Sequence, residues 1–223
     1  MKCELAVPLA LSQIEAAIRL QHHLSGETPS ERALYLLREQ LREWDLESCL
    51  VKSAALNQLY FTNVKPFMRT VRHVHRVMSQ TTEGLQEYEL VGRLALLPTS
   101  EDGQKPWKLF SFASKFAHFF IDSERFPIYD SFAEKMLAYH LGPNACLRNS
   151  LNPYQAFVMN FNNVRMRADL TCTTRELDKY LWLAGLYRQW KANPAKPRIN
   201  VDAERLFVNA SGEITRELER MIA

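Results

Sequence analysis

The stretch between Lys105 and Leu141 is rich in apolar side chains, and its first half follows a helical period. Apolar side chains recur there at helical spacing and also fill the flanks, which predicts a helix that is buried nearly all the way round. The apolar positions are Leu109, Phe110, Phe112, Ala113, Phe116, Ala117, Phe119 and Phe120. We therefore expect this helix at the centre of a core.

One line of polar side chains interrupts this helix. Its members recur at steps of three, four and three, so they share one face of the predicted helix: Lys108, Ser111, Lys115 and His118. After a short turn, helix is expected to resume at Asp130 or Ser131. An amine and a carboxylate from consecutive helices, Lys115 and Asp130, are the best candidates for chemistry. The alternative is structural, with Asp130 as an N-cap and Lys115 as a side chain that extends to solvent.

A second amphipathic pattern predicts a helix from Val64 to Met78. Its apolar face is Val64, Phe67, Met68, Val71, Val74 and Met78, and its other face is cationic: Lys65, Arg69, Arg72 and Arg76. No acidic residue occurs between Phe61 and Thr82. Such a face suits a phosphate backbone, and the alternative is an ordinary solvated helix surface.

The segment before this helix is rich in amide side chains. A helix is expected from about Leu46 to Phe61, with a break at Thr62 and Asn63. An amide such as Asn57 either hydrogen-bonds a neighbouring backbone group or faces a ligand, and the sequence leaves both interpretations open.

Composition predicts an all-α protein. Only 7 of the 223 residues are glycine, and alternating β-branched runs are hard to find, so little of the sequence favours hairpins. With 47% hydrophobic residues the chain can bury a sizeable core. We expect one two-lobed helical domain over residues 1–191, followed by a linker and helical tail over residues 192–223 that packs outside or mediates self-association.

Several classes of function are disfavoured. The net charge of +3 is too small to indicate nucleic acid by itself, so the distribution of charge must carry that argument. Four scattered cysteines and dispersed histidines predict neither a disulfide framework nor a metal site. No phosphate-binding glycine loop or nucleophile elbow occurs, and no cofactor is expected. The apolar run Leu5–Leu11 is too short for a membrane span, so we expect a cytoplasmic protein.

Four segments carry a resemblance to a known group of proteins: Leu56–Asn63, Ala113–Phe120, Phe126–Ser131 and Glu176–Trp182. They resemble a group of uncharacterised, often mobile-element-linked bacterial proteins over about Leu46 to Trp190. That group is distantly similar to the helix-hairpin-helix DNA glycosylases. The resemblance implies a DNA N-glycosylase, with or without lyase activity, that acts on a flipped damaged or modified base in DNA repair or phage defence.

The resemblance also implies roles for individual residues. Asp130 matches the aspartate that opens a helix after the hairpin in those enzymes, and Lys115 matches the nucleophilic lysine of the members with lyase activity. His118 would orient one of them or bind phosphate. Base-pocket residues would be Asn57, Tyr60 and Asn63, and DNA contacts would come from Lys65, Arg69, Arg72, Arg76, Lys108 and Ser111.

Two departures from the glycosylase pattern keep other functions open. The glycosylase hairpin is glycine-rich because backbone amides approach a DNA phosphate closely, whereas Leu109–Ser114 contains no glycine. The link between Lys115 and Asp130 is also shorter than in that superfamily. The alternatives are a non-catalytic nucleic-acid-binding module and a helical protein-interaction factor on the same scaffold.

Overall fold

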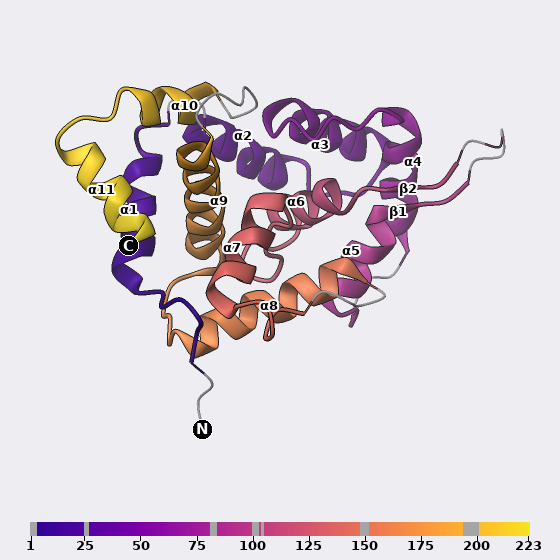
Figure 1. The fold of residues 1–223 in the computed structure, drawn as a ribbon. Helices are drawn as coiled ribbons and strands as arrows, with labels where there is room; N and C mark the ends of the chain where they lie inside the picture. Colours follow the sequence, from indigo (N-terminus) through magenta and orange to yellow (C-terminus); the bar gives the residue numbers. More distant parts are fainter. Residues whose placement is uncertain are drawn as a thin grey trace. The chain divides into compact units, whose positions relative to one another are not determined.

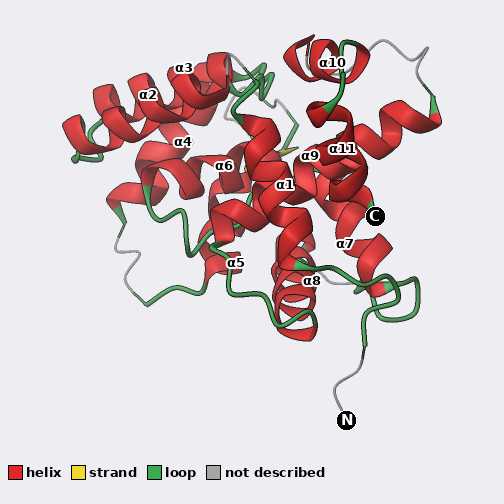
Figure 2. Cartoon of the chain, turned by 90° about the vertical axis from the view of Figure 1, so that its left-hand side faces the viewer, coloured by secondary structure: helices red, strands yellow, loops and turns green. Residues whose placement is uncertain are grey.

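A computed structural model describes residues 4–24, 27–80, 84–99, 103, 105–147, 152–193 and 201–223. Helices account for 67% of the described residues, which confirms the all-α class, and Figure 2 shows how little strand there is. The helices in these ranges (Figure 1) are α1 (Leu11–Gln21), α2 (Glu27–Gln40), α3 (Leu46–Leu59), α4 (Phe67–Ser79), α5 (Glu87–Ala95), α6 (Phe110–Phe120), α7 (Ser131–Leu141), α8 (Pro153–Arg167), α9 (Thr174–Ala192), α10 (Val201–Val208) and α11 (Glu213–Ile222).

Two helix starts follow directly from capping chemistry. Asp130 caps α7, and its Oδ1 accepts hydrogen bonds from the backbone N–H groups of Phe132 and Ala133, each at 2.8 Å. Thr173 caps α9 in a capping box with Glu176, whose carboxylate accepts from the Thr173 backbone N–H at 2.8 Å. The start at Asp130 was predicted above and is confirmed, and Thr173 with Glu176 three residues later has the sequence pattern of a capping box.

The start of α4 differs from the prediction. The sequence pattern placed it at Val64, whereas the helix begins at Phe67 with Pro66 at the N-cap. A residue that precedes proline is disfavoured in helical conformation, because the proline ring crowds its backbone. Lys65 therefore lies in the turn before α4 and not on the helix.

Contacts divide the chain into two compact units, each described here by itself. The first unit consists of Met1–Pro29, Asp130–Arg148 and Met159–Ala223, and the second of Ser30–Tyr129 and Asn149–Val158.

The second unit is built round α6. Phe112, Phe116 and Phe119 are almost fully buried, as the apolar pattern predicted. The ring of Trp44 lies 6.0 Å from that of Phe116, and the ring of Tyr60 lies 4.7 Å from that of Phe119. Helices α3 and α5 pack on α6, and α4 packs on α3. Val71, Val74 and Met78 of the predicted apolar face of α4 are buried, whereas Met68 is 44% exposed. Arg72 and Arg76 of the cationic face are exposed.

A short antiparallel ribbon joins α5 to α6 in this unit. Strand β1 (Leu96–Leu97) pairs with β2 (Trp107–Lys108), with Leu96 opposite Lys108 and Leu97 opposite Trp107. Lys108 therefore lies on a strand, and its predicted place on the helical stripe is wrong. Between the two strands, residues 100–102 and 104 lie outside the described residues.

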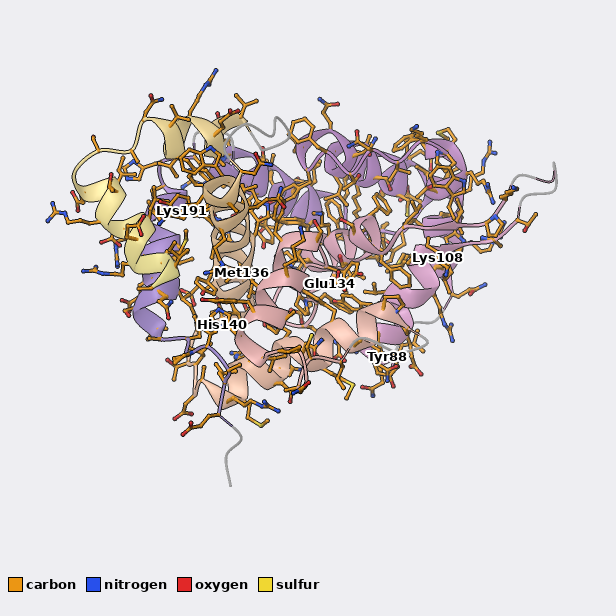
Figure 3. All side chains as sticks on the ribbon, viewed as in Figure 1. Tyr88, Lys108, Glu134, Met136, His140 and Lys191 are labelled. Atoms are coloured by element: carbon orange, nitrogen blue, oxygen red, sulfur yellow. The ribbon has the colours of Figure 1, made fainter. Side chains whose placement is uncertain are left out.

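The first unit packs α7 against α9, and α1 against α9 and α11. A Cβ on Gly185 of α9 would lie only 2.8 Å from the carbonyl oxygen of Phe132, so glycine permits the close approach of α7. Buried His140, labelled in Figure 3, donates from Nδ1 to the Val7 carbonyl at 3.0 Å and accepts at Nε2 from the Tyr180 hydroxyl at 2.9 Å. Burial lowers the pKa of His140, which favours the neutral ring of this linkage.

The C-terminal helices pack within the first unit. Leu218 and Met221 of α11 are buried, and Figure 1 shows α11 beside α1. Glu219 accepts hydrogen bonds from the Tyr187 hydroxyl and the Lys191 amine, each at 3.0 Å. The predicted linker began at residue 192, which is the last residue of α9, and its residues 194–200 lie outside the described residues. Self-association through the tail stays a prediction.

No helix in the described ranges combines the length and apolar character that a bilayer crossing needs.

Candidate functional site

The polar face of α6 carries three of the four predicted residues. Lys115 is half-buried and its amine donates to the Ser111 hydroxyl at 2.8 Å, which confirms that these two side chains share a face. His118 follows one turn later and is only 1% exposed. The helix therefore holds an amine at the edge of an aromatic core, one turn from a buried imidazole.

His118 is held from both sides. Its Nδ1 lies 2.9 Å from the carbonyl oxygen of Phe126, so this nitrogen carries the proton and donates it. Its Nε2 is then the acceptor for the Tyr35 hydroxyl, at 3.5 Å. A ring bound in this way fixes the backbone of the segment that follows α6.

The segment that precedes Asp130 is fastened to its own unit at three points. The first is the bond from His118 to Phe126. The second is the bond from the buried Tyr154 hydroxyl to the Pro127 carbonyl at 2.9 Å. The third joins the Tyr129 backbone N–H to the hydroxyl of Ser114 at 3.0 Å. The chain therefore returns to α6 at Tyr129, the residue before Asp130. Tyr129 contacts Ser114, the residue before Lys115.

Asp130 is the N-cap of α7 and begins the second segment of the first unit. Its Oδ1 accepts two backbone hydrogen bonds, which match the structural alternative considered from the sequence. A helix N-terminus also carries partial positive charge, which stabilises the carboxylate.

Cationic side chains on and before α4 fall into two groups. Lys65, Arg72 and Arg76 are exposed. Arg69 instead lies against the ribbon, where its Nη2 donates to the carbonyl oxygens of Pro98 and Lys105. The exposed group can meet a phosphate directly, whereas Arg69 already has backbone acceptors.

His73 lies on α4 among these cations. Its Nε2 donates to the Arg93 carbonyl at 2.8 Å, and its buried Nδ1 has no hydrogen-bond partner among the described residues. Burial lowers the pKa of His73, and the nearby charges of Arg76 and Arg69 lower it further. The ring is therefore neutral at pH 7 and joins α4 to the end of α5.

The three predicted pocket residues have local structural partners. Asn57 Oδ1 accepts from the Thr62 hydroxyl at 2.7 Å and from the Val64 N–H at 2.9 Å. The Tyr60 hydroxyl donates to Glu31 at 3.4 Å. Asn63 is exposed, has a positive φ of 51°, and donates to the Phe61 carbonyl. Asn57 thus fixes the turn between α3 and α4, as the first interpretation of this amide proposed.

We predict that Asn57→Ala destabilises the second unit by about 1–3 kcal/mol, because two hydrogen bonds that hold the α3–α4 turn are lost. Urea unfolding monitored by circular dichroism measures this change. Gln58→Ala, which truncates the exposed neighbouring amide side chain on α3, is the matched control and should cost less. Equal stabilities of the two variants would contradict the role of Asn57 in the turn.

Lys52 is a second amine near the core, at a position that no sequence pattern marked. It is only 1% exposed, donates to the Glu43 carbonyl at 3.0 Å, and lies 3.6 Å from the centre of the Trp44 ring. Burial lowers its pKa. A substrate cannot reach an enclosed amine, so Lys52 fastens the α2–α3 connection and is not a rival to Lys115.

The described ranges hold no group of three or more histidine, cysteine, aspartate or glutamate side chains close enough to bind a metal ion.

Comparison with protein families gives one match. Residues 13–125 match the family HI_0787_N, described as an N-terminal domain, over just over half of the 223 residues. The chain belongs to this family. No curated protein and no solved structure matches the chain. The HI_0787_N region contains α2 to α6, most of α1, and every predicted site residue except Asp130.

Proposed function

We propose that this protein is a cytoplasmic DNA-binding enzyme with a helix-hairpin-helix DNA glycosylase-like fold, and that it removes a flipped damaged or modified base. The bond between the Tyr129 N–H and Ser114 is the observation that carries the proposal. It holds the segment that ends at Tyr129 against α6 at the residue before Lys115, within the second unit.

The chemistry follows from the two side chains. A base in a duplex is stacked and paired, so it must be flipped out before its glycosidic bond can be reached. The Asp130 carboxylate would stabilise the cationic sugar that forms as the bond breaks. The Lys115 amine, once deprotonated, would form a bond to the anomeric carbon as the base departs, and opening of the sugar ring would then give a Schiff base. Ser111 would orient the amine through their 2.8 Å hydrogen bond.

Exposed cations near α4 would hold the DNA backbone. Lys65, Arg72 and Arg76 belong to a stretch of sequence without acidic residues from Phe61 to Thr82. Each phosphate contact releases counterions from DNA, so binding through this surface should weaken as salt increases.

Charge reversal tests this surface. Lys65→Glu with Arg72→Glu should weaken duplex DNA binding by about tenfold or more and lower the slope of log K against log salt by about 2. Fluorescence anisotropy of a labelled duplex at several salt concentrations measures both quantities. Arg32→Glu with Arg42→Glu makes the same charge change at exposed positions of the same unit and should have a smaller effect.

Unchanged binding and an unchanged slope in the Lys65→Glu, Arg72→Glu variant would contradict the proposed DNA surface. If the wild-type chain binds no DNA at low salt, both DNA-binding functions are excluded and the protein-interaction function remains.

One observation favours a second candidate, a non-catalytic nucleic-acid-binding module. Lys115 and Asp130 both have structural roles, as a donor to Ser111 and as the cap of α7. A fold that keeps both residues for these roles would bind DNA without releasing a base. Assays of base release on the DNA that the protein binds separate the two functions.

A further inference from the structure

The β1–β2 ribbon exposes an aromatic ring between two lysines. Trp107 is 41% exposed although tryptophan is usually well covered, and Lys105 and Lys108 are exposed on either side of it in the sequence. Leu96, opposite Lys108, is 50% exposed. Lys108 is labelled on this ribbon in Figure 3. None of the roles discussed so far uses Trp107.

Arg69 fastens this ribbon to α4. Its Nη2 donates to the Pro98 carbonyl, which follows β1, and to the Lys105 carbonyl, which precedes β2. One guanidinium therefore holds both arms of the ribbon. His73, one turn along the same helix, holds the end of α5 through the Arg93 carbonyl.

The ribbon, α4 and the end of α5 together expose several positively charged side chains. Exposed Arg72 and Arg76 lie on α4, exposed Arg93 lies in the last turn of α5, and Lys105 and Lys108 flank Trp107. Arg69 and Arg76 both lie close enough to His73 to lower its pKa, so charge is concentrated where α4 meets α5.

A surface with these properties fits a polyanion that also offers flat apolar rings. Single-stranded nucleic acid has this chemistry, because its phosphates attract cations and its unpaired bases stack on exposed aromatic rings. Protein partners that are acidic would satisfy the charges and leave the tryptophan without a matched contact.

We infer that the ribbon and α4 form one binding surface for unpaired DNA, in which Trp107 stacks on a base and Arg69 positions the ribbon instead of contacting phosphate. This inference deepens the proposed function and rests on it, since flipping a base leaves unpaired DNA beside the enzyme. It changes the predicted role of Arg69 and adds Trp107 to the contact surface.

Anisotropy with a fluorescein-labelled single-stranded 20-mer, measured over a salt series, tests the inference. Trp107→Ala should weaken binding about tenfold with an unchanged salt slope, because stacking releases no counterions, and Trp107→Phe should restore most of the affinity. Arg72→Gln should lower the slope by about 0.7, whereas Arg69→Gln should weaken binding and leave the slope unchanged.

A double-mutant cycle isolates the positioning role. In the Arg69→Gln background, Trp107→Ala should cause little further loss, because the ribbon is already released, whereas its effect should add to that of Arg72→Gln. Hydrogen exchange should also rise in the ribbon of the Arg69→Gln variant and not in that of Arg72→Gln.

Wild-type affinity in the Trp107→Ala variant would overturn the inference and leave the proposed function intact. Unchanged hydrogen exchange in the Arg69→Gln ribbon, or a slope that falls as it does for Arg72→Gln, would overturn the positioning role. Absence of DNA binding by the wild-type chain would overturn the proposed function together with the inference.

Discussion

Lys115→Gln is expected to abolish covalent capture of the protein on DNA by borohydride. Reduction traps a Schiff base, and only an amine that has replaced the base at the anomeric carbon forms one. Glutamine keeps an N–H donor for Ser111, whose hydroxyl accepts from the lysine at 2.8 Å, so the local fold should persist. Gel electrophoresis of the reduced protein–DNA adduct measures the yield.

A matched control is Lys135→Gln, which removes an exposed lysine of α7 that donates to Gln189 at 3.1 Å. Its adduct yield should equal that of the wild type. Equal yields from Lys115→Gln and the wild type would exclude Lys115 as the nucleophile. If the wild type forms no adduct but releases a base, the enzyme has no lyase activity and Lys115 has another role.

Asp130→Asn is expected to lower the single-turnover rate of base release about 100-fold, because a neutral amide cannot stabilise the sugar cation as a carboxylate does. Asparagine caps helices about as well as aspartate, so α7 should keep its start at Ser131. Asp130→Ala serves as the structural comparison and should cost about 1 kcal/mol of stability, since it removes the acceptor for two backbone N–H groups.

Wild-type stability together with wild-type base release in the Asp130→Asn variant would show that the carboxylate serves only as a cap. Thermal unfolding by circular dichroism, measured on both variants, separates the loss of the cap from the loss of the charge.

Local chemistry explains which elements could be predicted from the sequence. Asp130 and Thr173 mark helix starts because their side chains accept hydrogen bonds from backbone groups two or three residues away. The buried aromatic face of α6 follows from helical spacing alone. Such interactions span a few residues and are therefore visible in a single sequence.

Longer-range interactions explain what the sequence did not predict. Lys108 fits the helical stripe by spacing, yet it lies on a strand because it pairs with Leu96 across a loop. Arg69 fits the cationic face, yet its guanidinium is held by the carbonyls of Pro98 and Lys105, far along the chain. These carbonyl groups come within reach of Arg69 only after the chain has folded, so the periodicity of the sequence cannot identify them as its acceptors.

In the candidate site too, contacts within one helix could be predicted from the sequence, and contacts between separate segments could not. Sequence patterns brought Ser111 and Lys115 together correctly, because they are one helical turn apart. The bond from the Tyr129 N–H to Ser114 joins residues in different segments, and no spacing rule predicts it. This bond and the bond from His118 to the Phe126 carbonyl together link α6 to the segment that precedes Asp130.

The most direct test is base release by the wild-type chain beside its Asp130→Asn variant, on duplexes that each carry one damaged or modified base. Alkaline cleavage at the abasic site reports the release. The proposed function predicts cleavage of at least one duplex by the wild type and about 100-fold slower cleavage by the variant. Intact duplexes after firm binding by the wild type, or equal rates for the two proteins, would contradict it.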